Sequence, residues 1–254
     1  MSLITRLTHQ SAKLLLSPRR YVTRMPVKTG DDRPAIYLTF DDGPHPDRTS
    51  RILDQFAESG GHATFFAIGR RARRHPQTLR RILREGHAVG CHTWRHWSSR
   101  RKPFHDYLED VRRSRDELQQ ITGHKISLFR PPYGELTPLV LLTLMLDGFR
   151  IVHWTHDTRD FELPTVPDLW QRFDNEPLAD GDVVLMHDDR CVTSYALGDC
   201  LREWGAHAEF HAIPMNGGSS VPQSAASQLP PPQSQVLLVP NEKQLVGTAP
   251  KLRN

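Results

Sequence analysis

The sequence predicts an α/β fold with a distorted (β/α) barrel of about seven parallel strands in a single domain. Short apolar runs alternate with helical patterns along residues 31–214, as expected when helices connect the strands of a parallel sheet. One domain of this length favours a closed or nearly closed barrel over a doubly wound sheet. Reactive side chains also follow the ends of the expected strands, where parallel α/β folds build their sites.

Strands are expected where a short apolar run is bounded by turn residues. The first run, at residues 35–40, reads AIYLTF and is typical of a buried strand. In chain order, the strands are expected at residues 35–40, 63–66, 88–90, 127–129, 150–153, 182–186 and 209–213.

Helices are expected between these strands. In the segment 76–85, Leu79, Ile82 and Leu83 recur at helical spacing and should face inward. In chain order, the helices are expected at residues 48–58, 76–85, 107–121, 138–146, 167–173 and 192–204.

The two ends of the chain differ in composition from the body. Residues 1–30 carry six basic and no acidic side chains, and we expect a poorly ordered segment there, with a basic amphipathic helix on an anionic surface as the alternative. Residues 215–254 are rich in Pro, Ser and Gln and should be disordered. The folded domain is therefore placed at residues 31–214. The formal net charge of +4 comes from the ends, which argues against a generally basic protein that binds nucleic acid.

Three cysteines, Cys91, Cys191 and Cys200, are too few for a disulfide scaffold. We expect free thiols in a reducing compartment, and a Cys191–Cys200 bridge is the alternative. No run approaches the ~18 apolar residues that a membrane span needs, and the N-terminal apolar stretch is too short for the core of a signal peptide. The sequence thus predicts a protein of the cytoplasm, either free or bound peripherally to a membrane.

The first motif with chemical content is TFDDGP at residues 39–44. Two adjacent carboxylates at a strand end, Asp41 and Asp42, repel each other unless a cation or a shared proton relieves them. Gly43 and Pro44 then turn the chain sharply. A solvated turn and a metal-binding pair are equally good interpretations of this motif taken alone.

The second motif, HTWRH at residues 92–96, supplies candidates for the remaining ligands of a cation. Histidines at positions i and i+4 lie on one face of a helical turn, so the nitrogens of His92 and His96 can bind the same ion. Two histidines with one aspartate make a three-ligand set that leaves positions open, as in catalytic sites. Zinc fits this set best, and other divalent ions remain alternatives.

Two further segments bring polar groups to strand ends. RPPYG at residues 130–134 is a rigid turn that presents the backbone N–H of Tyr133, and LMHD at residues 185–188 places the imidazole of His187 at the end of a strand. With TFDDGP, HTWRH and DTRDF at residues 157–161, these segments resemble the polysaccharide deacetylase family, which is also called the NodB homology domain or carbohydrate esterase family 4. The five motifs stand in order and extend over nearly all of the expected domain.

This resemblance implies a distorted barrel, a divalent metal and the hydrolysis of N-acetyl groups on the amino sugars of a glycan. It assigns the general base to Asp41, the general acid to His187, and the metal to Asp42, His92 and His96. An amide carbonyl resists attack, so such an enzyme needs an activated water, charge stabilisation and a proton for the leaving amine.

The resemblance also implies the supporting groups. The backbone N–H of Tyr133 would stabilise the oxyanion, Arg130 would orient Asp41, and Asp157 would orient the general acid. Leu185 would line the pocket for the acetyl methyl group. The chain departs from the family at Phe161, where Trp is usual, so the wall on the methyl side should be smaller and the acyl or sugar preference can differ.

Two alternatives to a deacetylase remain at this point: an amidase of the same fold that acts on another small amide, and a non-catalytic module that binds glycans or surfaces. The region before the metal histidines is strongly basic, and it contains Arg70, Arg71, Arg73, Arg74, Arg80, Arg81 and Arg84. These arginines either form a solvated helical face or contact an anionic glycan, a lipid head group or a membrane surface. No aromatic side chains are interleaved with them, so nucleic acid is not expected as a partner.

Overall fold

The computed structural model describes residues 20–27, 33–163, 165, 167–169 and 177–215. The expected amphipathic segment up to residue 19, the tail beyond residue 215 and residues 170–173 of one expected helix lie outside the described residues. The part of that helix at residues 167–169 is helical, as predicted.

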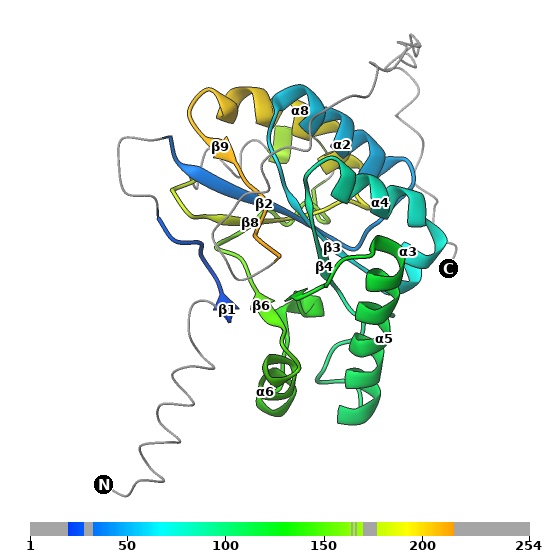
Figure 1. Ribbon diagram of the computed structural model, residues 1–254. Helices are drawn as coiled ribbons and strands as arrows, with labels where there is room; N and C mark the ends of the chain where they lie inside the picture. Colours follow the sequence, from blue (N-terminus) through cyan, green and yellow to red (C-terminus); the bar gives the residue numbers. More distant parts are fainter. Residues whose placement is uncertain (1–19, 28–32, 164, 166, 170–176, 216–254) are drawn as a thin grey trace, which may run out of the picture. The chain divides into compact units, whose positions relative to one another are not determined.

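The described strands form one parallel sheet (Figure 1), which confirms the predicted fold class. The path of paired strands runs β1-β6-β5-β4-β3-β2-β8-β7, and β9 also pairs with β2. This curved sheet is a half-barrel, with β1 and β7 at the two ends of the path. The strands are β1 (Tyr21–Val22), β2 (Ala35–Asp41), β3 (Thr64–Ala67), β4 (Ala88–Cys91), β5 (Leu128–Phe129), β6 (Arg150–Val152), β7 (His156–Asp157), β8 (Val183–His187) and β9 (Glu209–Phe210).

Two strands differ from the prediction. β1 lies inside the segment that was expected to be a poorly ordered end, and it pairs with β6 through Tyr21 and Ile151. The ordered part of the chain therefore includes residues upstream of 31. β7 was not predicted either, because two residues are too short to show a periodic pattern.

The helices lie outside the sheet, and neighbouring helices contact one another: α2 contacts α8, and α5 contacts α3, α4 and α6 (Figure 1). The short helix α3 was not predicted, because its sequence GRRARR contains no apolar periodicity. α4 begins with Pro76, and α2 ends before Gly60, whose φ of 75° suits a helix end. The helices are α2 (Arg48–Ser59), α3 (Gly69–Arg74), α4 (Pro76–Arg84), α5 (Phe104–Thr122), α6 (Pro138–Leu146) and α8 (Cys191–Gly205), with a 3₁₀ turn at Pro132–Gly134.

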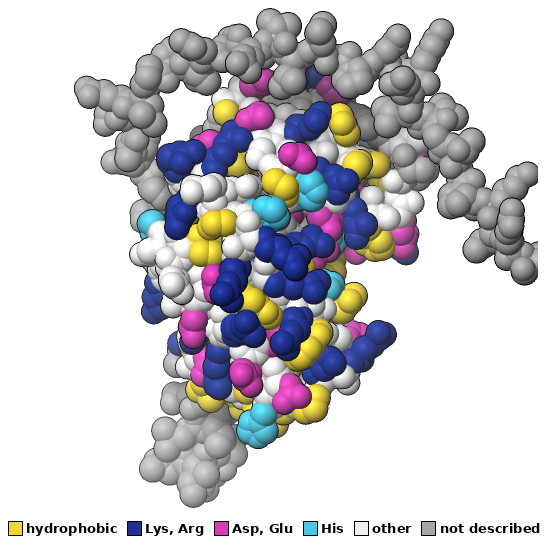
Figure 2. All heavy atoms as spheres, turned by 90° about the vertical axis from the view of Figure 1, so that its right-hand side faces the viewer, with side chains coloured by type: hydrophobic (Ala, Val, Ile, Leu, Met, Phe, Trp, Pro, Cys, Tyr) yellow, Lys and Arg dark blue, Asp and Glu magenta, His cyan; other side chains and the backbone are white. Residues whose placement is uncertain are grey.

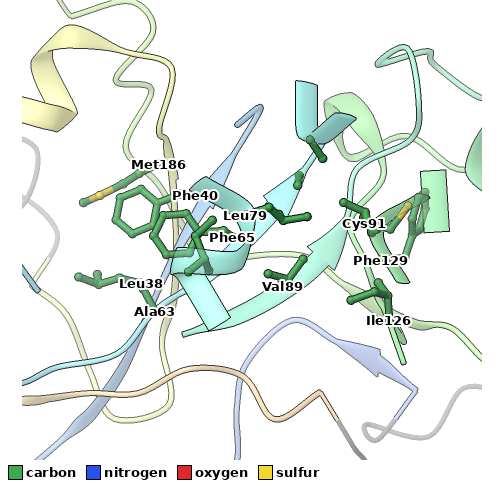
Figure 3. Packing of buried hydrophobic residues seen from close by; sticks show 14 of the residues in the cluster. Leu38, Phe40, Ala63, Phe65, Leu79, Val89, Cys91, Ile126, Phe129 and Met186 are labelled. Carbon is green, nitrogen blue, oxygen red and sulfur yellow. The ribbon is translucent and has the colours of Figure 1, made fainter. Parts of the chain in front are cut away.

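The core is divided between the two faces of the sheet. Successive side chains of a strand point to opposite faces. On β3, Phe65 belongs to the large cluster beneath the helices, whereas Phe66 belongs to a smaller cluster on the other face of the sheet. Phe65 stacks on Phe40 of β2 with ring centroids 5.1 Å apart, and Figure 3 shows both rings close to Met186. This packing fixes the central strands that carry the reactive residues.

The register of the sheet brings the sequence motifs to one edge. Asp41, the last residue of β2, is the register partner of His187, the last residue of β8. Asp157 of β7 is paired in the same way with Leu185. The expectation that these motifs meet at the carboxyl edge of the sheet is therefore confirmed.

Cys91, Cys191 and Cys200 are free thiols, as expected, and the alternative Cys191–Cys200 bridge is not formed. Among the described residues, we find no helix with both the length and the apolar character needed to cross a membrane.

Candidate active site

A cavity of about 560 Å³ lies at this carboxyl edge, within the usual size range of a ligand pocket. Its lining brings together nine of the ten residues that the sequence singled out. These are Asp41, Asp42, His92, His96, Tyr133, Asp157, Phe161, Leu185 and His187. The tenth, Arg130, is fully buried and bonded to Asp41.

Asp42, His92 and His96 form the one group in the described chain whose ligand atoms are close enough to share a metal ion, with all of them within 4.8 Å of one another. The Oδ1 atom of Asp42 lies 3.2 Å from Nε2 of His96 and 3.7 Å from Nε2 of His92. This oxygen is buried and accepts no hydrogen bond. A buried carboxylate oxygen between two imidazole nitrogens is costly without a cation, so these residues fit a divalent ion.

The orientation of His92 also suits a ligand. Its Nδ1 lies 2.8 Å from the carbonyl oxygen of Arg130, and because a carbonyl only accepts, Nδ1–H must donate. The lone pair therefore remains on Nε2, the atom that faces Asp42. A backbone carbonyl that fixes the tautomer in this way is common behind metal-binding histidines.

The HTWRH segment is a loop and not the helical turn that the i, i+4 spacing suggested. Thr93 and His96 have φ angles of 61° and 62°, in the left-handed region. The loop is held by hydrogen bonds from the backbone N–H groups of Trp94 and Arg95 to the Asp110 carboxylate, at 2.8 and 3.0 Å. The two imidazoles still converge, with ring centroids 5.0 Å apart, but tertiary contacts and not helical periodicity bring them together.

Backbone geometry also marks the motif residues. Asp42 has a φ of 77° and Tyr133 a φ of 61°, so both lie in the left-handed region, like Thr93 and His96. Non-glycine residues in this region are held there by their surroundings at a cost of about 1 kcal/mol or more each. Their concentration around one cavity is typical of a functional site.

Arg130 bonds directly to Asp41. Its Nη1 lies 2.9 Å from Oδ1 of Asp41 and 2.7 Å from the hydroxyl of Thr39. Its remaining donors bond to the carbonyl oxygens of Val152 and His153, and its guanidinium lies over the ring of Phe66. All of these contacts fix the orientation of Asp41, whose second oxygen, Oδ2, faces His92 Nε2 at 3.8 Å.

The partner of His187 differs from the expectation. The family resemblance implied this role for Asp157, but the Nδ1 atom of His187 lies 2.6 Å from Oδ1 of Asp160. The other oxygen of Asp160 accepts hydrogen bonds from the backbone N–H of His187 and from the hydroxyl of Thr193. Asp160 is 1% exposed, whereas Asp157 is exposed in the cavity and accepts a bond from the backbone of Arg159.

These contacts set the protonation of His187. Burial alone would lower its pKa, but the hydrogen bond and charge of Asp160, with the charges of Asp41 and Asp42, raise the pKa to about 9. The imidazole is therefore protonated at neutral pH and can give up a proton. By contrast, burial and the neighbouring His92 lower the pKa of His96 to about 4, which leaves it neutral, as a metal ligand must be.

Part of the cavity wall is formed by aromatic and apolar side chains. The ring of Phe161 packs edge-on against the His187 imidazole, with ring centroids 5.4 Å apart. Tyr133 packs against His96 in the same way, with ring centroids 4.8 Å apart. Leu185 and Trp154 also line the cavity. Sequence analysis missed Trp154, because it stands in a loop outside every motif.

A further set of polar residues supports the site from behind. The Arg71 guanidinium donates to the backbone oxygen of Asp42 at 2.6 Å and to the Asp189 carboxylate at 2.8 Å. It thereby connects the loop after β2 to the loop after β8. Asp188 is buried beside Gly43 and accepts a hydrogen bond from Thr49 at 2.6 Å. A Cβ atom at position 43 would lie within 2.4 Å of the Asp188 carboxyl group, so only glycine fits there.

The chain is similar in sequence and structure to known deacetylases. A family model described as polysaccharide deacetylase matches residues 28–152. The chain is 34% identical to the peptidoglycan-N-acetylmuramic acid deacetylase PdaC of Bacillus subtilis over 188 residues, which cover 73% of this chain and 39% of that relative. It is 33% identical to a peptidoglycan-N-acetylglucosamine deacetylase of Bacillus cereus, covering 74% of this chain and 88% of the relative.

A chitooligosaccharide deacetylase of Azorhizobium caulinodans is 35% identical, covering 61% of this chain and 73% of the relative. The solved structure of PdaC superimposes with a TM-score of 0.68 at 30% identity and covers 73% of this chain and 90% of the solved chain. The chain spans well under half the length of full PdaC.

Proposed function

The chain belongs to the polysaccharide deacetylase family, and from this premise we propose that it hydrolyses the N-acetyl group of an amino sugar in an oligo- or polysaccharide. The relatives named above are described as deacetylases of peptidoglycan or chitooligosaccharides. The observation that carries the proposal is the unpartnered, buried Oδ1 of Asp42 between two imidazoles, with Asp41 and His187 on the strands beside it.

Asp42, His92 and His96 would hold a divalent metal ion, and the mixed nitrogen and oxygen donors favour zinc. When bound, such an ion supplies polarisation of the amide carbonyl and stabilisation of negative charge. Two imidazoles and one carboxylate leave coordination positions open, which suits a catalytic role and not a purely structural one.

Asp41 would act as the general base. Arg130 occupies its Oδ1, so Oδ2 is the oxygen available to take a proton from the attacking water. This oxygen faces the same space as the three ligand atoms, since it lies 3.8 Å from Nε2 of His92. Asp42 is committed to the metal, and therefore only one carboxylate of the adjacent pair is free to accept a proton.

His187 would act as the general acid. Its Nδ1–H donates to Asp160, so the proton on Nε2 is the one available for transfer to the leaving amine. An amine leaves an amide readily only after it is protonated, and a charged imidazole in the cavity meets that need. His187 is the register partner of Asp41 on the neighbouring strand, which supports this pairing of acid and base.

For the oxyanion and the acetyl group we keep the residues that the family resemblance implied. The Tyr133 backbone N–H would bind the oxyanion, and Leu185 with Phe161 would contact the acetyl methyl group. Asp157 lines the cavity and its charge acts on Arg130, so we retain it as a group of the active site without a contact to the general acid.

The test is acetate release from chito-oligosaccharides by the purified full chain. We expect turnover that a chelator abolishes and that zinc restores. Asp41→Asn should remove at least about 99% of the activity, because general base catalysis contributes about 10²–10⁴-fold. An amidase for another substrate would bind zinc but release no acetate from any glycan, and a binding module would bind glycans without turnover.

A further inference from the structure

The arginines of the basic stretch divide into engaged and free side chains. Arg71 bonds to Asp42 and Asp189, Arg81 pairs with Asp54 and Glu85, and Arg80 donates to a backbone oxygen. The other side chains are exposed and make no hydrogen bond or ion pair within the part of the chain that the structure describes; they are Arg70, Arg73, Arg74 and Arg84. Figure 2 shows many Lys and Arg side chains on the face where α3, α4 and α5 lie.

Only one of these free side chains, Arg70, lines the cavity. It lies in α3, directly after β3. Arg190 lines the same cavity from the loop after β8. Unlike Arg70, it was not named in the sequence analysis. Because β3 and β8 flank β2 along the main path of the sheet, these arginines reach the cavity from both sides of the strand that carries Asp41.

The position of Arg190 is unfavourable for the helix that follows it. It is the N-cap residue of α8, and its side chain makes no capping hydrogen bond. The N-terminus of a helix carries partial positive charge, so a cation there is repelled. The Nε atom of Arg190 lies 3.1 Å from Oδ1 of Asp189, but the other oxygen of that carboxylate already pairs with Arg71. The Asp189 carboxylate therefore pairs with two guanidinium groups, those of Arg71 and Arg190, and Arg70 has no acidic partner among the described residues. These three arginines thus bring more positive charge to the cavity than Asp189 neutralises.

We propose that Arg70 and Arg190, which line the cavity together with the Arg71–Asp189 pair, bind an anionic group of the glycan whose N-acetyl group is hydrolysed in the same cavity. The inference rests on the proposed function and narrows its substrate class to acidic glycans. A guanidinium group binds carboxylate and phosphate alike through two parallel N–H···O bonds. The anion is thus either the carboxylate of an acidic sugar or a phosphate on an amino sugar.

The test compares acetate release from three probes by the zinc-loaded full chain. Chitopentaose is neutral, a hyaluronan hexasaccharide carries carboxylates beside its N-acetyl sugars, and N-acetylglucosamine 6-phosphate carries a phosphate. We expect one acidic probe to have the highest kcat/KM, and this probe identifies the anion. Arg70→Gln/Arg190→Gln should lower the ratio of acidic to neutral kcat/KM by about 10–100-fold, mainly through KM, because two charge-assisted hydrogen bonds are lost.

The matched control is Arg73→Gln/Arg84→Gln, which removes the same two charges from arginines outside the cavity and should leave the ratio unchanged. A control variant that lowers the ratio equally would show general attraction to a basic surface and would overturn the inference. Equal kcat/KM for neutral and acidic probes in the unaltered protein would overturn it as well.

Calorimetric binding separates this inference from the proposed function. We expect the preferred acidic probe to bind about tenfold more tightly than chitopentaose, with the difference lost in the double variant and reduced in about 0.5 M salt. If no probe releases acetate but this binding preference is observed, the proposed function fails and the anion site stands. If acetate is released but binding shows no preference for the acidic probes, the proposed function stands and the anion site is overturned.

Discussion

Asp160 holds His187 by two contacts, from Oδ1 to the imidazole Nδ1 at 2.6 Å and from Oδ2 to the backbone N–H at 2.8 Å. The carboxylate fixes the ring and, with its charge, raises the pKa of the imidazole. The general acid must be protonated, so activity should be present below this pKa of about 9 and lost as the pH rises through it.

Asp160→Asn should therefore lower the pKa of His187 toward its ordinary value near 6.5 and move the alkaline limb of the kcat profile to lower pH. At pH 7 a pKa near 6.5 leaves about a quarter of the imidazole protonated, so we expect a loss of about fourfold in kcat from the change in protonation. The measurement is the pH dependence of acetate release. The paired variant Asp157→Asn should keep the alkaline limb in place, because Asp157 does not contact His187; a shift in that variant instead would restore the original assignment.

The buried pair of Arg130 and Asp41 should be more important for stability than any surface ion pair. Arg130 is 0% exposed, and its removal would leave Asp41 without its charged partner. Arg130→Met should lower the free energy of unfolding by about 3–5 kcal/mol, as is usual when a buried ion pair loses one member. Urea unfolding measures the change. Arg112→Met removes a half-exposed pair with Asp147 and should cost less than about 1 kcal/mol.

Metal binding should stabilise the folded chain. A ligand that binds only the native state at 100 times its Kd contributes about 2.7 kcal/mol. We therefore expect zinc to raise the Tm and a chelator to reverse the change. His96→Ala should abolish this response and lower the bound zinc measured by atomic absorption, whereas His105→Ala, at an exposed position outside the cavity, should change neither. An unchanged zinc content in His96→Ala would show that the ligand set is wrong.

The sequence was sufficient to predict a parallel sheet and the convergence of the motifs, because both follow from alternating apolar runs and from the common direction of parallel strands. It could not predict which aspartate of DTRDF contacts His187. Between these two aspartates, Arg159 adopts a left-handed φ of 51°, which turns the chain so that Asp160 is buried and Asp157 remains in the cavity. Such a local reversal has no signature in apolar periodicity.

The lack of a sequence signature for tertiary contacts also explains why the histidine loop, Arg190 and Trp154 were not predicted. His92 and His96 converge through a loop that Asp110 holds from α5, a contact between distant parts of the fold. Arg190 and Trp154 reach the cavity only because β8 and β6 end at the same edge of the sheet as β2. Residue spacing alone carries no information on contacts of this kind.

Asp188 gives a prediction for stability against pH. Burial raises the pKa of this carboxyl group to about 8, and nearby Asp189 and Asp42 add to the effect, although the hydrogen bond from Thr49 opposes it. The unfolded chain has an ordinary Asp pKa near 4, so between about pH 4 and pH 8 the native state binds more protons at this site. The group therefore lowers the free energy of unfolding as the pH rises through this range, by at most about 1.4 kcal/mol per pH unit.

Asp188→Asn keeps the shape of the side chain but cannot ionise, so this penalty should disappear. We expect the Tm of the variant, relative to the unaltered protein, to be higher at about pH 8.5 than at about pH 5, with a chelator present in both measurements. Asp116→Asn, at an exposed position on α5, should show the same relative Tm at both pH values. A relative Tm for Asp188→Asn that is independent of pH would mean that Asp188 is ionised in the native state, and that its buried charge is balanced by Arg71 and not avoided by protonation.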